Sequence, residues 1–220
     1  MNLLPEIRYY LILFVSILTI SGCRHLQSNK KLPILGRKDI KETEVNGKIT
    51  YDTIYHKIAD FSFIDQDSNE VTNATFQNRI YVADFFFTTC PTICPIMKTQ
   101  MLRVYEYFKD NDQVMFLSHT IDPDYDTVAL LHDFADRLGV SSTKWHFVTG
   151  QKEAIYEIGQ LSYMVTAMED ENAPGGYLHS GAFILVDKDR RIRGMYDGTS
   201  DDDVDRLIKD IPKLLKEYEH

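Results

Sequence analysis

Residues 79–95 read RIYVADFFFTTCPTICP, and the architecture of the chain can be worked out from this stretch. Residues 79–87 form an almost unbroken apolar and aromatic run, which is typical of a central strand buried on both faces. Residues 88–95 follow as a loop with two prolines and two cysteines. From residue 96 to residue 109 the apolar side chains recur at helical spacing, so we expect a helix there. Pro95 suits the first position of that helix, where a missing N–H costs nothing.

The rest of the chain alternates between strand and helix patterns. Strand patterns occur at residues 61–64, 70–72, 114–121, 145–148, 181–187 and 191–196, and helical spacing occurs at residues 126–138, 152–161 and 201–218. This alternation predicts an α/β fold with a mixed central sheet flanked by helices and an N-terminal β-hairpin extension. We expect Asp126 and Ser200 to cap their helices, Gly139 to close the first of them, and Pro212 to kink or interrupt the last.

Length and composition narrow the classes of protein. The chain has 220 residues, of which 44% are hydrophobic, and a formal net charge of -9. This length fits one globular domain with tails. The acidic balance argues against a nucleic-acid-binding protein, because no surplus of positive charge is available to meet phosphates. Three cysteines are too few for a small fold held together by disulfides.

An apolar segment, residues 9–20, lies near the N-terminus. It is shorter than the roughly 20 residues that a membrane-spanning helix needs, and it is typical of a secretory signal. Residues 20–23, Ile-Ser-Gly-Cys, resemble the bacterial lipoprotein box. This resemblance implies that residues 1–22 are removed as a signal peptide and that Cys23 carries lipid, so that the exported chain is anchored on the periplasmic side of a membrane. The alternative is a short buried helix with an incidental free cysteine.

The segment between the lipid site and the domain is polar and shows no sustained period. We interpret residues 23–54 as a tether, with a short strand near residues 48–51. A tether would let an anchored domain reach a partner in the membrane, but it could equally be a passive spacer. The folded domain then spans residues 55–220.

Cys90 and Cys94 lie between the buried strand and the helix. We expect Cys94 at the helix N-terminus, where free backbone N–H groups and the helix dipole favour a thiolate. Two thiols at this spacing can close a disulfide or bind one soft metal ion with both sulfurs. Outside the cytosol such a pair oxidises unless it is reduced or metallated. A structural disulfide, a redox pair and a metal site therefore all remain open.

Three motifs in the same order resemble the Sco/SenC family of copper-handling proteins. The first is TTCPTICP at residues 88–95, directly after the hydrophobic strand. The second is Ile-Asp-Pro at residues 121–123, followed by Asp126 and Thr127. The third is Leu-His-Ser at residues 178–180, before the apolar residues 182–186. The resemblance covers roughly residues 55–218, and it implies a thioredoxin-like fold.

The resemblance also implies that Cys90, Cys94 and His179 bind copper. Cu(I) prefers thiolate ligands, and an imidazole would complete a three-coordinate site. Cu(II) remains open as a second oxidation state. The seven histidines of the chain leave His119 and His179 as equal candidates on the residues alone, because His119 ends a central strand beside the cysteine loop. The resemblance selects His179.

Two further residues are candidates for supporting the site. Asp122 and His119 fall at the end of the same strand, where either could orient a ligand or tune a thiol. For Asp122, a role in a turn or a cap is an equal alternative. Met97 lies one turn after Cys94, and its place among Met101 and Phe108 favours a core position over a ligand.

We weigh three functions for the cysteine pair. The first is a copper metallochaperone, not strictly an enzyme, that passes copper to the copper-binding subunit of cytochrome c oxidase during assembly, as the resemblance implies. The second is a thiol–disulfide oxidoreductase that keeps the oxidase cysteines reduced, with Cys90 attacking, Cys94 resolving and a thiol reductant as a further partner. The Cys-x-x-x-Cys spacing leans away from dedicated thioredoxin-like reductants. A thiol peroxidase is third, because Thr89 is present but no arginine lies close in sequence.

Overall fold

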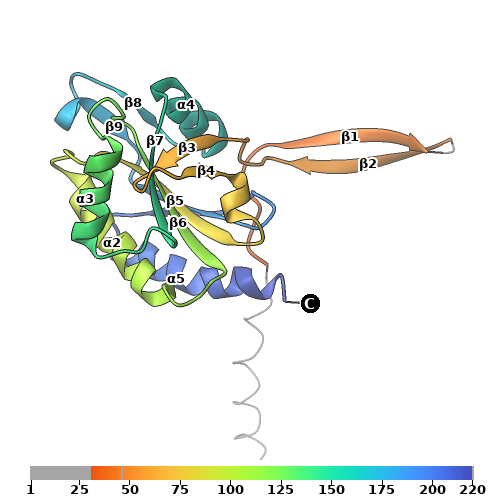
Figure 1. Ribbon diagram of the computed structural model, residues 1–220. Coiled ribbons are helices and arrows are strands. Elements are labelled where there is room, and N and C mark those ends of the chain that lie inside the picture. The colour runs from red at the N-terminus through yellow and green to blue at the C-terminus, as the bar shows by residue number, and fades with distance from the viewer. Residues whose placement is uncertain (1–30, 46, 220) are drawn as a thin grey trace, which may run out of the picture. The chain divides into compact units, whose positions relative to one another are not determined.

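The computed structural model describes residues 31–45 and 47–219. The expected signal peptide and the lipid site at Cys23 lie outside the described residues. The central strand is β5 (Ile80–Phe86), in which all seven residues are buried. The apolar run at residues 79–87 therefore forms the strand that the sequence predicts, with a neighbour on each edge (Figure 1).

The main sheet has seven strands in the order β11-β10-β5-β6-β7-β3-β4. Strands β5, β6 and β7 are parallel to one another, and the other neighbours pair antiparallel. The bounds of the remaining strands are β3 (Ser62–Asp65), β4 (Glu70–Thr72), β6 (Val114–Thr120), β7 (Trp145–Thr149), β10 (Ala182–Val186) and β11 (Ile192–Asp197). This mixed sheet, with the β3–β4 hairpin at one edge, confirms the predicted α/β class and its hairpin extension.

Helices cover both faces of the sheet. The helical elements are η2 (Asn73–Phe76), α2 (Ile93–Phe108), α3 (Val128–Leu138), α4 (Lys152–Glu157), η3 (Ile158–Ser162), η4 (Pro174–Gly176) and α5 (Asp201–Lys216). Side chains alternate along a strand, so Phe85 and Phe86 point to opposite faces. Phe86 meets Phe134 of α3 and Lys98 of α2, whereas Phe85 meets Tyr163 beside η3. No helix in the described part of the chain is long and apolar enough to cross a bilayer.

Of the predictions about helix ends and breaks, two were confirmed and two needed correction. Thr127, not Asp126, caps α3, because its hydroxyl accepts from the Leu130 N–H. Gly139 closes that helix in the left-handed region, as expected. Ser200 caps α5 as predicted, but α5 continues through Pro212 without interruption.

Residues before β3 form more regular structure than the sequence indicated. Strands β1 (Lys38–Val45) and β2 (Lys48–Tyr55) pair antiparallel as a two-stranded sheet of their own, in place of one short strand at residues 48–51. The side chains on both faces of this hairpin are almost all exposed, including Ile40 and Tyr51. Polar residues on both faces removed the alternation by which a half-buried strand is recognised.

Candidate metal centre

The two cysteines occupy the corner between β5 and α2. The backbone N–H of Cys90 donates to the Phe87 carbonyl, so the chain turns directly after the strand. Helix α2 begins at Ile93, three residues earlier than predicted, which places Cys94 in its first turn. Pro95 is tolerated at the next position because the first N–H groups of a helix have no acceptor within it. Cys90 and Cys94 are both buried and both free thiols.

His179 reaches these sulfurs from a separate ribbon. Strands β8 (Ala167–Glu169) and β9 (Tyr177–His179) pair with each other, with Ala167 opposite His179. The His179 Nε2 lies 3.3 Å from the Cys94 Sγ and 3.9 Å from the Cys90 Sγ. Its Nδ1 donates to the Ser180 carbonyl at 3.3 Å, since a carbonyl oxygen can only accept. The Nε2 lone pair is therefore free to face the two sulfurs.

Phe87 holds the ribbon against the cysteine loop. Its ring packs on Tyr177 with a centroid distance of 5.0 Å and meets the His179 imidazole edge-on at 5.8 Å. Gly175 has a φ of +82°, and a Cβ there would lie 3.0 Å from the Phe87 ring and 3.1 Å from Pro91. Only glycine fits this crossing without displacing the loop.

The pKa values of the two thiols are shifted in opposite directions. Burial opposes ionisation of Cys90, but hydrogen bonds from Cys94 and Thr92 outweigh it and lower the pKa of Cys90. Burial, reinforced by Cys90, raises the pKa of Cys94. Burial also lowers the pKa of His179, which favours the neutral imidazole. The expectation that the helix N-terminus favours a thiolate at Cys94 is therefore wrong, because burial dominates at this position.

The three donor atoms fit one metal ion. They lie within 4.8 Å of one another. With bonds of ~2.3 Å to sulfur and ~2.0 Å to nitrogen, a bridging ion allows a sulfur–nitrogen separation of up to about 4.3 Å, and both observed separations are shorter. Two sulfurs and an imidazole suit a soft ion with few ligands. Within residues 31–45 and 47–219, no other group of three histidine, cysteine or acidic side chains converges this closely.

His119 lies apart from this group. Its ring is fully buried and stacks on Phe85 at 4.7 Å, with Phe63 and Tyr163 at its edges. Neither ring nitrogen has a hydrogen-bond partner among the described residues. Burial lowers the pKa of His119 to about 3. The side-chain alternation of β6 points this residue to the sheet face opposite α2, a detail that its place at the strand end does not reveal.

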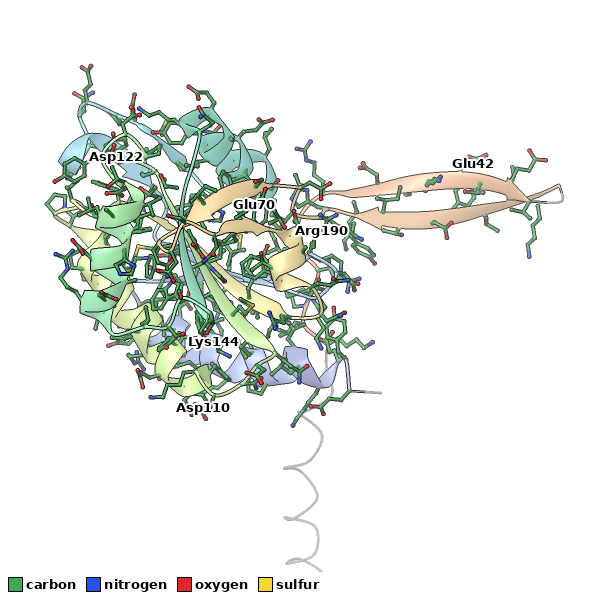
Figure 2. All side chains as sticks on the ribbon, viewed as in Figure 1. Glu42, Glu70, Asp110, Asp122, Lys144 and Arg190 are labelled. Atoms are coloured by element: carbon green, nitrogen blue, oxygen red, sulfur yellow. The ribbon has the colours of Figure 1, made fainter. Side chains whose placement is uncertain are left out.

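Asp122 follows β6 at the edge of the sheet near the β8–β9 ribbon (Figure 2). Its backbone carbonyl accepts from the N–H groups of Tyr125 and Asp126, which makes it part of a turn. Its carboxylate raises the pKa of Tyr177, after the larger effect of burial. It is not hydrogen-bonded to either sulfur or to the His179 ring. Met97 is fully buried within the hydrophobic core.

Sequence reasoning missed Lys98, which lies one turn after Cys94 and is almost fully buried. Its Nζ lies 2.7 Å from Asp84 and 3.0 Å from Ser118, on the two central strands. A signal was present, because Lys98 falls on the apolar face of α2 between Cys94 and Met101.

Comparison with known proteins places this geometry in a family. The SCO1/SenC family model matches residues 51–216. The chain belongs to the SCO1/SenC family. A SCO1/SenC family lipoprotein from Bacillus anthracis is similar in structure, with 27% identity, a TM-score of 0.67, and coverage of 73% of this chain and 95% of that one. The thioredoxin-like fold that the motifs implied is thus confirmed for this SCO1/SenC protein.

Two further solved members describe what relatives do. BsSco, a member of the Sco family of cytochrome c oxidase assembly proteins in which a disulfide switch was identified, shares 28% identity at a TM-score of 0.64, covering 72% of this chain and 93% of that one. Arabidopsis thaliana ScoI, solved with copper bound, shares 26% identity at a TM-score of 0.61, covering 73% of this chain and 98% of that one.

Proposed function

We propose that this SCO1/SenC protein is a membrane-tethered copper metallochaperone that delivers Cu(I) to the copper centre of cytochrome c oxidase. The observation that carries the proposal is the approach of the His179 Nε2 to both sulfurs from a ribbon distant in sequence. A disulfide needs only the two cysteines, whereas a metal site gains a ligand from the imidazole. The copper-bound Arabidopsis relative and the oxidase-assembly role of BsSco support the same cargo and partner.

Loading requires the reduced pair. Cys90 and Cys94 bind the ion as thiolates, each after giving up a proton. A disulfide has no thiolate to offer, so oxidation of the pair prevents copper binding. Copper is the cargo here, and the protein itself supplies two thiolates and one neutral imidazole from three buried residues. Transfer then proceeds by exchange of these ligands for those of the acceptor.

The test is an anaerobic Cu(I) titration of the reduced full-length chain against a chromophoric Cu(I) chelator. We expect one ion per chain, and affinity lost in Cys90→Ser and Cys94→Ser and reduced by about a hundredfold or more in His179→Ala, because each change removes a ligand from a small set. His119→Phe is the matched control and retains wild-type affinity. Unchanged affinity in His179→Ala rejects the three-ligand site.

A second function, thiol–disulfide exchange, is favoured by one observation. The pKa of Cys90 is lowered although burial opposes it, as an attacking thiol requires. In this role Cys90 would reduce the oxidised cysteines of the oxidase copper site, Cys94 would resolve the mixed disulfide, and a separate thiol reductant would restore the pair. His179→Ala distinguishes the two roles, since lost Cu(I) binding with intact disulfide exchange supports the chaperone.

The place of the protein in the cell is part of the proposal. Residues 1–22 would direct export and Cys23 would carry the lipid that holds the domain on the periplasmic side of the membrane. The lipoprotein from Bacillus anthracis is a family precedent for such an anchor. Cys23→Ala should release the protein from the membrane fraction, and mass spectrometry of the native chain should find acyl groups on Cys23. A chain that starts at Met1 and remains soluble would reject the anchor.

A further inference from the structure

A buried ion pair lies next to the cysteine site. Lys98, on α2, is only 4% exposed, and its Nζ lies 2.7 Å from the Asp84 carboxylate. The ammonium also sits 3.9 Å from the centre of the Phe86 ring. The pair is therefore removed from water and enclosed by aromatic rings.

The carboxylate of the pair is fixed from its other side. The Ser118 hydroxyl donates to Asp84 at 2.5 Å and accepts from the Trp145 indole N–H at 2.9 Å. Buried ion pairs of this kind add little to stability compared with apolar side chains of the same volume, although removing one partner is costly. Stability alone therefore gives no reason to keep a lysine here.

The lysine of the pair lines the same pocket as the sulfurs. A pocket of about 300 Å³ is lined by Cys90, Cys94 and Lys98 together with apolar and hydroxyl side chains of the β5–α2 corner, α2 and α3. Lys98 is the one charged residue in this lining, and Asp84 is not part of it. Lys98 is also one helical turn from Cys94, which places the two side chains on the same face of α2.

Loading changes the charge of this buried site. The two thiols release two protons to water and one Cu(I) ion enters, so the site passes from neutral to a net charge of minus one. A negative charge held away from water is expensive unless a positive charge lies close by. Resting on the proposed function, we propose that Lys98 is the internal counter-ion of the copper-loaded site and that Asp84 and Ser118 position it.

The test uses the reduced, copper-free full-length chain. The double variant Asp84→Asn/Lys98→Met removes the pair without leaving a single buried charge. We expect its Cu(I) affinity to fall by about tenfold or more, because the positive charge that is removed lines the pocket of the sulfurs and the negative charge of Asp84 does not. Lys98→Arg keeps the charge and should retain most of the affinity. Lys144→Met is the matched control, since Lys144 is also buried, 8% exposed, but lies at the other end of the sheet (Figure 2).

A second measurement separates charge from shape. In a glutathione buffer at mildly acidic pH, Cys90 and Cys94 lose two electrons and two protons to oxidised glutathione and form a disulfide, so the site is uncharged before and after. A counter-ion role predicts that this equilibrium constant changes less than about threefold in the double variant. An equal loss in both measurements shows that Lys98 only shapes the pocket, and overturns the inference.

The outcomes also separate the inference from the proposed function. If the wild-type chain binds Cu(I) and the double variant binds it equally well, Lys98 is not the counter-ion and the inference alone fails. If the wild-type chain does not bind Cu(I), both the proposed function and this inference fail.

Discussion

Two buried histidines of this protein have opposite surroundings. His179 is 9% exposed and His119 is fully buried, and burial lowers the pKa of both. The Nδ1 of His179 has a carbonyl acceptor and its Nε2 faces two sulfurs, whereas both nitrogens of His119 lack partners among the described residues. Burial alone therefore does not distinguish a ligand from a core residue. The groups that meet the ring nitrogens do.

The largest effect expected from this contrast is the acid sensitivity of His119. Its pKa is about 3 in the fold against an ordinary value of 6.5, so between these values the unfolded chain binds the extra proton. The free energy of unfolding should then fall as the pH falls through this window, with about 3 kcal/mol lost to His119 between about pH 7 and about pH 4. Urea unfolding of the copper-free protein at a series of pH values measures this loss.

The control for this prediction is His119→Phe, which keeps an aromatic ring in the aromatic cluster and removes the titrating group. Its stability should decline less steeply with acid than that of the wild type. Identical slopes for the two proteins would mean that His119 is protonated or solvated in the fold, and the two histidines would then not differ in this respect.

A smaller effect is expected where the His179 ribbon crosses the cysteine loop. Gly175→Ala should cost about 2 kcal/mol, because it combines a left-handed backbone with a Cβ pressed against Phe87. It should also weaken Cu(I) binding, since Phe87 packs on His179. Urea unfolding and chelator competition measure the two effects.

Gly47→Ala is the matched control, because Gly47 has a φ of +74° but nothing lies within 4 Å of its added Cβ. It should cost about 1 kcal/mol and leave Cu(I) binding unchanged. Equal losses at the two glycines would show that the contact with Phe87 does not position the ribbon.

The smallest effect concerns Met97, whose thioether sulfur would be a fourth ligand if it were not simply part of the core. Met97→Leu conserves volume in the core and should cost less than about 1.5 kcal/mol. Cu(I) affinity should stay within about twofold of wild type. A tenfold loss of affinity with normal stability would assign the Met97 sulfur to the site.

The fold was largely readable from periodicity. The apolar run of β5 and the helical spacing of α2 both arise from burial, because buried positions are occupied by apolar residues in a regular pattern. The helix start was less readable. Cys94 is helical although it precedes Pro95, and a proline ring disfavours helical backbone in the residue before it. The β1–β2 hairpin was not readable, since neither of its faces is buried.

The candidate site was readable only in part. The cysteine spacing indicated a pair, and the family resemblance, not the residues themselves, selected His179 over His119. The choice depends on which face of a strand each ring occupies and on a ribbon pairing distant in sequence, and neither follows from local pattern. The ionisation of Cys94 was misjudged, because burial at Cys94 exceeds the influence of the helix terminus.

The site is divided between two sheets. The sulfurs lie at the corner between β5 and α2, beside the seven-stranded sheet. The imidazole belongs to β9, and the β8–β9 pair forms no backbone ladder with that sheet. A small displacement of the ribbon would withdraw one ligand and leave the other two in place, without breaking a ladder of the central sheet. A bound copper ion would then be held by the two sulfurs alone when an acceptor arrives, and transfer would begin on the side that the imidazole has left.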